Sequence, residues 1–145
     1  MASRRKGRIL AFQALYWWEA SHVNTEELMS FIWLEKEKRE ALGEEICSFS
    51  RLLISGTIEN IKIIDNTIKK HLNNWDMSRL NRVDLAIMRI SVYTLLYQKD
   101  IAPLIIIDEA IGISKTFGTD DSFRFINGVL DSINKSINKK AEEEK

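Results

Sequence analysis

Basic side chains gather at the start of the chain, where they could bind the phosphates of a nucleic acid. The cluster consists of Arg4, Arg5, Lys6 and Arg8. These residues lie within about one helical turn, close enough to engage several phosphates together. A guanidinium is a planar fork that can bridge phosphate oxygens or stack on a base. On charge alone, the other interpretation is a solvated, floppy terminus. Gly7 weakens a helix here, which favours an arm (residues 1–8) that orders on binding.

A second candidate site lies between Gly118 and Gly128. A helix that begins in this segment would offer free backbone N–H groups to a phosphate. The side chains that could add a hydroxyl, a charge, an aromatic face or an amide are Ser122, Arg124, Phe123, Phe125 and Asn127. Asp120 and Asp121 would repel phosphate, and helix capping is the simpler explanation for both. The alternative is that Asp121 limits affinity, so that tight binding needs a second protein.

Residues suited to catalysis are scarce. His22 and His71 are the only histidines, and neither lies near Cys47 or in a ligand-spaced cluster. The sequence has no phosphate-binding glycine loop, nucleophile elbow or HExxH motif. The adjacent acids Asp108 and Glu109 would point in different directions on a helix. We therefore expect no catalytic residue, no metal, no cofactor and no enzymatic activity.

Length and composition indicate one domain. A chain of 145 residues can bury a sizeable core without a disulfide or metal. The lone Cys47 has no partner in the chain, which fits a reducing compartment. No apolar run is long enough to span a bilayer and no signal peptide is recognisable, so we expect a soluble, cytoplasmic protein. Net charge is zero, but the first eighteen residues carry four positive charges and no acid. Local positive charge is sufficient for nucleic-acid binding.

Helical periodicity dominates the chain and predicts a single all-α domain. Asn24, with Glu27 three residues later, predicts a helix start, and Pro103 suits a first helical turn. Gly118 is expected to take a left-handed helix cap. Residues 35–40 are predicted to be a solvated connection or frayed helix, and residues 138–145 a polar tail. The predicted helices span residues 5–20, 25–34, 42–71, 79–97, 103–117 and 122–137.

Two glycines and a tryptophan pair carry packing predictions. Gly56, inside a long helix, would allow close helix packing or a mild bend. Gly128 is expected to let another helix approach; the alternative is that Asn127 bonds to a neighbouring helix or to RNA. Trp17 and Trp18 are adjacent and cannot both face one core, so one should be exposed or covered by a partner.

Three motifs resemble the NusB family of bacterial transcription antitermination factors. Residues 108–131 (DEAIGISKTFGTDDSFRFINGVLD) resemble its closing motif. Residues 4–8 (RRKGR) running into residues 11–16 (AFQALY) form the second, and residues 83–93 (VDLAIMRISVY) the third. The motifs stand in the family's order and cover nearly the whole chain. Lys6-Gly7, Gly112 and the triple isoleucine 105–107 depart from the family, and residues 35–44 show no usable resemblance.

The resemblance implies an all-α fold, a compact bundle of about six to seven helices arranged as two packed bundles. Residues 1–145 would form one RNA-binding domain. Such proteins pair with NusE, a small-subunit ribosomal protein, and bind the boxA element of nascent, single-stranded RNA. The pair joins the elongating RNA polymerase complex with other Nus factors and suppresses termination, notably on ribosomal RNA operons. Family members occur as monomers and homodimers, and both states stay open.

The resemblance also implies roles for individual residues. The arginine-rich start contacts RNA in the family, which gives this role to Arg4, Arg5, Lys6 and Arg8. In the closing motif, the candidate RNA-binding residues are Asp121, Ser122, Arg124, Phe125 and Asn127. Tyr16, Asp84 and Phe125 lie where the family contacts its protein partner. A core or solvated-surface role is the alternative for each of these three.

Two other functions remain open from the sequence. One is a helical adaptor that binds only proteins and carries an incidental basic arm. The other is a relative of the helical RNA-binding domain that precedes the catalytic domain of some ribosomal RNA methyltransferases. Because the chain ends in a charged tail at Lys145 and lacks a cofactor-binding glycine motif, a free-standing binder is the favoured expectation.

Overall fold

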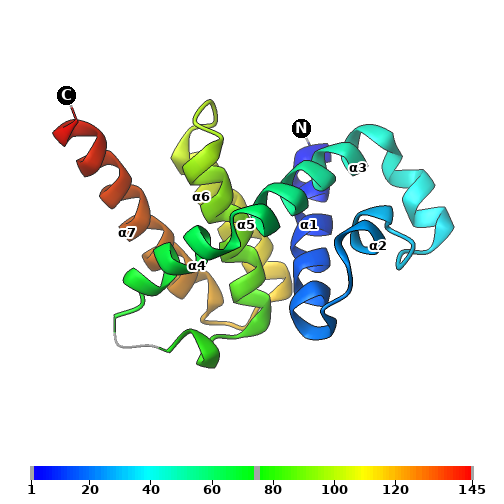
Figure 1. Ribbon diagram of the computed structural model, residues 1–145, viewed down its shortest axis with the longest axis horizontal. Coiled ribbons are helices and arrows are strands. Elements are labelled where there is room, and N and C mark those ends of the chain that lie inside the picture. Colours follow the sequence, from blue (N-terminus) through cyan, green and yellow to red (C-terminus); the bar gives the residue numbers. More distant parts are fainter. Residues whose placement is uncertain (1, 74–75, 145) are drawn as a thin grey trace.

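The computed structural model describes residues 2–73 and 76–144, with side chains from Arg4 onward. Across these residues it contains seven α-helices, one short 3-10 helix and no β-strand (Figure 1). The helices are α1 (Ala2–Ser21), α2 (Thr25–Ser30), α3 (Lys36–Glu59), α4 (Ile61–Lys70), the 3-10 helix η1 (Met77–Arg79), α5 (Arg82–Tyr97), α6 (Pro103–Phe117) and α7 (Ser122–Glu143). The predicted all-α fold and helix number are confirmed.

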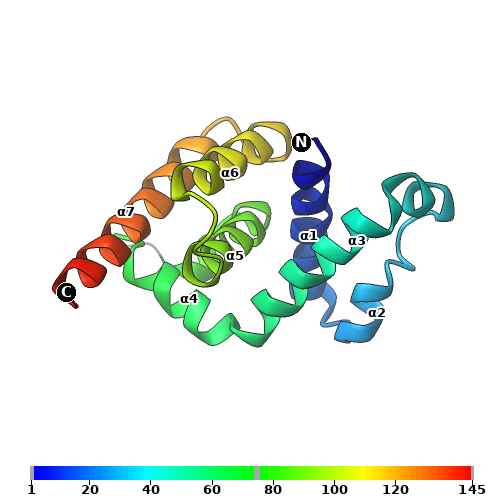
Figure 2. The same ribbon diagram turned by 90° about the horizontal axis from the view of Figure 1, so that it is seen from above.

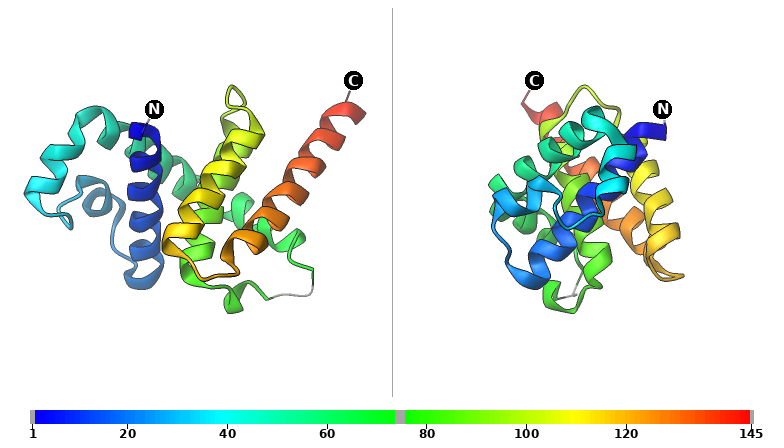
Figure 3. Two further views of the ribbon diagram at one scale, coloured as in Figure 1. Left: turned by 180° about the vertical axis from the view of Figure 1, so that it is seen from behind. Right: turned by 90° about the vertical axis from the view of Figure 1, so that its right-hand side faces the viewer.

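The helices form two packed groups. In the first, α1 and α2 both pack against α3; in the second, α4, α6 and α7 pack around α5. Figure 2 shows the two groups side by side, joined where α3 continues into α4. The groups are also held together by α1 and α3, which both contact α5. Helix α1 runs beside α6 as well, in the same direction (Figure 3, left).

Helix α5 is the centre of the molecule. Its residues from Asp84 to Leu95 are all buried, so apolar side chains occupy most positions around the helix. Its first turn is capped by Asn81, whose side-chain oxygen accepts hydrogen bonds from the N–H groups of Val83 and Asp84. None of the described helices is both long and apolar enough to span a membrane.

Several predicted helix boundaries are wrong. The long helix predicted over residues 42–71 is two helices, broken at Asn60, whose side-chain amide donates to the Gly56 carbonyl. Residues 36–40 are the exposed first turn of α3, and a kink follows at Gly43, where φ is 82°. Gly118 is not left-handed: φ is −91° and ψ is −170°, so its backbone is extended. Helix α7 continues through most of the predicted polar tail.

Two of three glycines lie where helices approach closely. The predicted close packing at Gly56 is confirmed, because a Cβ atom there would overlap the ring of Tyr93. At Gly128 the packing prediction is wrong, since nothing lies within 4 Å of a built Cβ. A Cβ at Gly7 would lie 2.5 Å from Phe49, and the Ser50 hydroxyl donates to the Gly7 carbonyl at 2.6 Å. The basic arm is therefore a helix docked on α3.

For the tryptophan pair, the prediction is one ring exposed or covered by a partner, and an exposed ring is not observed. Trp17 and Trp18 are both half-buried. The Trp17 ring lies 5.8 Å from that of Trp33, and the Arg89 guanidinium lies 5.9 Å from the Trp18 ring. The exposed aromatic side chain of this segment is Tyr16, which is 44% exposed.

A buried arginine joins helices of both groups. Arg89 of α5 donates to both carboxylate oxygens of Asp65 at 2.9 Å and to Glu19 at 2.8 Å. Burial lowers the pKa of Arg89, but the hydrogen bonds with the two acids outweigh it, and the net direction is upward. The hydrogen bond from Arg89 lowers the pKa of Glu19. Arg89 thereby ties α1 and α4 to the central helix.

Candidate nucleic-acid interface

The basic cluster does not project in one direction. Arg4 and Arg8, four residues apart, lie on one side of α1 over the Phe49 ring, at 4.3 and 5.6 Å from its centre. Arg5 faces α6, and Lys6 lines a groove on the other side of α1. Arg4 and Lys6 are exposed. The four charges therefore lie on different sides of the first turns of the helix.

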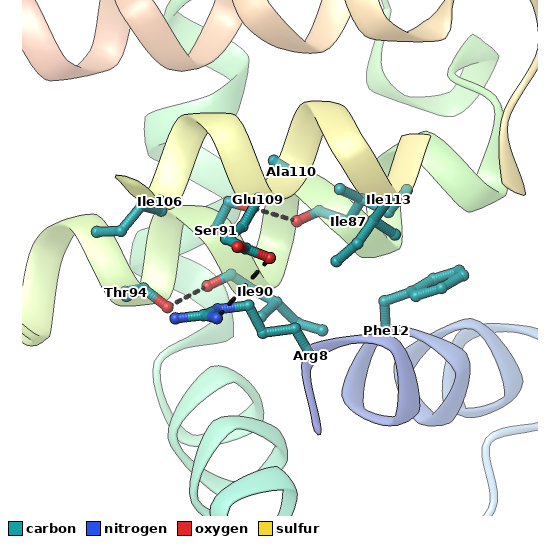
Figure 4. Close-up of a pocket in the computed structure, with 10 residues that line it drawn as sticks. All are labelled: Arg8, Phe12, Ile87, Ile90, Ser91, Thr94, Ile106, Glu109, Ala110 and Ile113. Carbon is teal, nitrogen blue, oxygen red and sulfur yellow. Dashed lines mark hydrogen bonds and ion pairs between the residues drawn. The ribbon is translucent and has the colours of Figure 1, made fainter. Parts of the chain in front are cut away.

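A carboxylate on α6 holds two of the arginines. The Arg5 Nε atom donates to Glu109 at 2.6 Å. Arg8 Nη1 lies 4.0 Å from the same carboxylate oxygen (Figure 4). The hydrogen bond with Glu109 raises the pKa of Arg5, whereas burial lowers the pKa of Arg8. The Arg8 side chain is only 12% exposed. The freely presented charges of the cluster are thus Arg4 and Lys6.

The pocket beneath Arg8 is too small for a ligand. It lies between α1, α5 and α6, and its volume is about 10 Å³, room for about one water molecule. Figure 4 shows Arg8 reaching into it beside Ser91 and Thr94. Both hydroxyls donate to backbone carbonyls of their own helix. The basic cluster therefore presents a surface, which suits an extended polyanion rather than a small molecule.

The turn between α6 and α7 is organised by Ser122. Its hydroxyl oxygen accepts the Thr119 N–H at 2.9 Å, and the residue is 1% exposed. The capping role predicted for Asp121 is wrong, because its side chain makes no cap hydrogen bond. Asp120 and Asp121 are both exposed. Both carboxylates are therefore at the surface, and the Asp121 carboxylate does not cap α7.

The first turns of α7 present charge and amide groups outward. Arg124 and Lys115 both lie over the Phe123 ring, at 5.4 and 5.0 Å from its centre. Asn127 is exposed, while Phe125 is half-buried and packs against the core. The result is a basic, aromatic surface rimmed by Asp120 and Asp121.

The three predicted partner residues lie in different surroundings. Tyr16 borders a pocket of about 260 Å³ that Glu19, Ala20 and Arg82 also line. Asp84 is 6% exposed. Burial raises the pKa of the Asp84 carboxyl, and a hydrogen bond from Ser122 partly offsets this. Asp84 therefore connects α5 to the start of α7.

Helix α6 separates the two groups of candidate RNA-binding residues. Arg5 meets Glu109 near its middle, and the Asp121 turn follows its end, about 12 Å further along the helix axis at 1.5 Å per residue. The structure thus places both groups along α6 without bringing them into contact. Sequence reasoning missed Glu109 and Phe49 as neighbours of the arginines, because no local pattern links residues 104 positions apart.

Comparison with known proteins identifies the family. Residues 5–135 match the model of the NusB family. The transcription antitermination protein NusB of Treponema pallidum is 51% identical over 133 residues, covering 92% of this chain and 93% of the relative.

Solved structures agree. A structure of T. maritima NusB superposes with a TM-score of 0.81 at 37% identity, covering 91% of this chain and 90% of the other. A crystal structure of the antitermination factors NusB and NusE in complex with double-stranded RNA superposes with a TM-score of 0.82 at 26% identity, covering 94% and 98%. The chain belongs to the NusB family, whose members are non-enzymatic transcription antitermination factors.

Proposed function

We propose that this chain binds boxA-type RNA together with NusE and joins the elongating RNA polymerase complex with other Nus factors in the cytoplasm, notably on ribosomal RNA operons. The observation that carries the proposal is the likeness to the NusB protein solved with NusE and RNA, over 94% of this chain. The exposed cations at the start of α1 support it. Residues 1–145 act as one RNA-binding domain.

RNA would run along the side of the molecule that carries α6. Arg4, Arg5, Lys6 and Arg8 supply positive charge at one end, with Arg8 acting from beneath the surface. At the other end, Arg124 meets phosphate and Asn127 offers an amide to a base edge. Ser122 and Phe125 shape the start of α7, and Asp121 opposes phosphate at the rim.

NusE would dock beside Tyr16. The exposed phenol and the pocket that it borders with Glu19 and Arg82 offer both apolar and charged contacts. Asp84 of α5 and Phe125 of α7 are the further candidate residues for this partner. Because RNA and NusE would lie on neighbouring surfaces, each is expected to raise the affinity for the other by the same factor.

Removing Arg4 should weaken RNA binding and its salt dependence together. A phosphate contact on single-stranded nucleic acid contributes about 0.7 to the slope of log affinity against log salt, so Arg4→Ala should make the slope shallower by about 0.7. The measurement is titration of a fluorescent boxA-type RNA, and of a scrambled RNA, at several salt concentrations with and without NusE.

The matched control is Lys70→Ala, which removes an exposed cation from α4, away from the arm. It should leave the slope unchanged. Wild-type binding that is absent, or equal for the scrambled RNA even with NusE present, would refute the proposed function and leave a helical adaptor.

Asp121→Asn is expected to tighten RNA binding. The side chain is exposed and makes no cap hydrogen bond, so its charge is free to repel an approaching phosphate. Removing one such charge should raise affinity about two- to fivefold, the range of exposed charge pairs, without lowering the melting temperature. Glu45→Gln, on the exposed side of α3, serves as the charge-matched control. Equal affinity of Asp121→Asn and wild type would show that Asp121 does not restrain RNA.

A further inference from the structure

Glu109 and Gly112 of helix α6 form a contact site, the Arg5 seat, for one of the basic side chains. We propose that Glu109 and Gly112 hold Arg5 against α6 and thereby weaken RNA binding by the protein alone. The inference rests on the proposed RNA-binding function. It adds Glu109 as a residue that determines RNA affinity. The charge of Glu109 is opposite to that of the basic cluster on α1.

The geometry of the seat involves both residues. Arg5 Nε donates to Glu109 at 2.6 Å, so one edge of the guanidinium is occupied by a carboxylate. The rest of the group lies against the backbone of Gly112: a Cβ there would be 2.5 Å from Nη1 and 2.7 Å from Nη2. Only a glycine leaves room for a guanidinium this close to the helix.

The contact with Glu109 reduces the positive charge that Arg5 offers to a phosphate at the surface. A phosphate that approaches Arg5 also approaches the Glu109 carboxylate, whose repulsion offsets much of the attraction. Arg8 shares the same carboxylate oxygen at 4.0 Å and is mostly buried. Of the four cations at the start of α1, Glu109 therefore compensates the two that face α6, and Arg4 and Lys6 remain to attract RNA.

Little free energy is needed for the Arg5 side chain to leave this contact. The Arg5 side chain is 43% exposed, so it can swing into solvent without opening the core. Glu109 would keep Arg8 nearby after Arg5 leaves. The Arg5 side chain can thus exchange between its contact with Glu109 and a contact with an RNA phosphate.

The first test replaces the carboxylate. Glu109→Gln keeps the shape of the side chain and removes the charge that opposes phosphate. RNA affinity should rise about fivefold in moderate salt, as expected for one exposed charge, and the salt slope should steepen by about 0.7 as Arg5 gains a phosphate. The probe is the fluorescent boxA-type single-stranded RNA, without NusE.

Asp108→Asn is the matched control, since Asp108 is exposed, precedes Glu109 on the same helix and loses the same charge. Its salt slope should equal that of wild type. In an Arg5→Ala background, Glu109→Gln should give a smaller gain and no steeper salt slope from Arg5, because the side chain that it releases is missing.

Gly112→Ala provides a test that leaves every charge in place. The three atoms nearest to its Cβ would all belong to the end of the Arg5 side chain, which can move. The variant should bind RNA more tightly with an unchanged or higher melting temperature, since alanine favours the helix. A purely structural contact predicts a lower melting temperature and no gain in affinity.

The outcomes separate the two proposals. If wild type binds RNA selectively but Glu109→Gln and Gly112→Ala bind no more tightly, the seat does not restrain Arg5 and the proposed function stands. Weaker binding by Glu109→Gln would also overturn the inference, because Glu109 would then orient Arg5 for RNA. Absence of selective binding in all variants would refute the proposed function as well.

Discussion

Arg89→Ala is expected to destabilise the protein by about 3 kcal/mol. The substitution leaves Asp65 and Glu19 without the buried cation that they share, and loss of one partner of such an ion pair typically costs about 3–5 kcal/mol. The lower end applies because the Asp65 and Glu19 side chains are 21% and 32% exposed. For a domain of this size, the melting temperature should fall by about 10 °C.

Thermal or urea unfolding followed by circular dichroism measures this loss. Arg82→Ala is the control, because Arg82 also pairs with Glu19, at 3.6 Å, but is 47% exposed. It should cost less than about 1 kcal/mol. Equal losses in the two variants would show that burial of Arg89 is not the source of its effect.

The effect of Arg89 should depend on pH in a defined direction. Its hydrogen bond lowers the pKa of Glu19 in the folded state. A carboxyl group with a lowered folded pKa stabilises the protein above its unfolded value of about 4.3, and the contribution disappears as pH falls through the folded pKa. The difference between wild type and Arg89→Ala should therefore shrink below about pH 4.

Arg89 also bears on the proposed NusE surface. It fixes Glu19, which lines the same pocket as Tyr16. A variant that folds but lacks this hydrogen bond would no longer hold Glu19 in place, and the lining of that pocket would change. The central helix thus contributes to the partner surface through a residue that the partner would not touch.

The helices could be predicted from the sequence where local signals exist. Asn24 accepts the Glu27 N–H as predicted, and α6 begins at Pro103. The break at Asn60 could not be predicted, because apolar residues continue at helical spacing on both sides. Neither glycine nor proline marks that position, and only the packing of α4 against α5 and α7 sets the new direction.

The candidate site could also be predicted only in part from the sequence. Charge clustering pointed to the arm, and the resemblance pointed to the start of α7. What the sequence could not indicate is which charges are compensated. The Glu109 pairing with Arg5 and the burial of Asp84 depend on contacts between helices, and the hydrogen bond from the Thr119 N–H to Ser122 depends on the geometry of the turn.

Gly56→Ala is expected to destabilise the protein by about 1–2 kcal/mol. The added methyl group would overlap the Tyr93 ring, which is 8% exposed and packs against the Tyr97 ring at 5.5 Å. Because Tyr93 is enclosed, it cannot swing aside, and α3 must move away from α5. Overpacking of this kind costs about 1–3 kcal/mol or more, which outweighs the gain of up to about 1 kcal/mol in helix propensity.

Gly128→Ala is the matched control, since Gly128 also lies within a helix but has open space where its Cβ would be. It should stabilise the protein by about 0.5–1 kcal/mol, measured by the same urea unfolding. Opposite signs for the two substitutions would show that contact between α3 and α5 determines the need for glycine at position 56. A loss of stability at both positions would contradict this, and would indicate that Gly128 has a packing role after all.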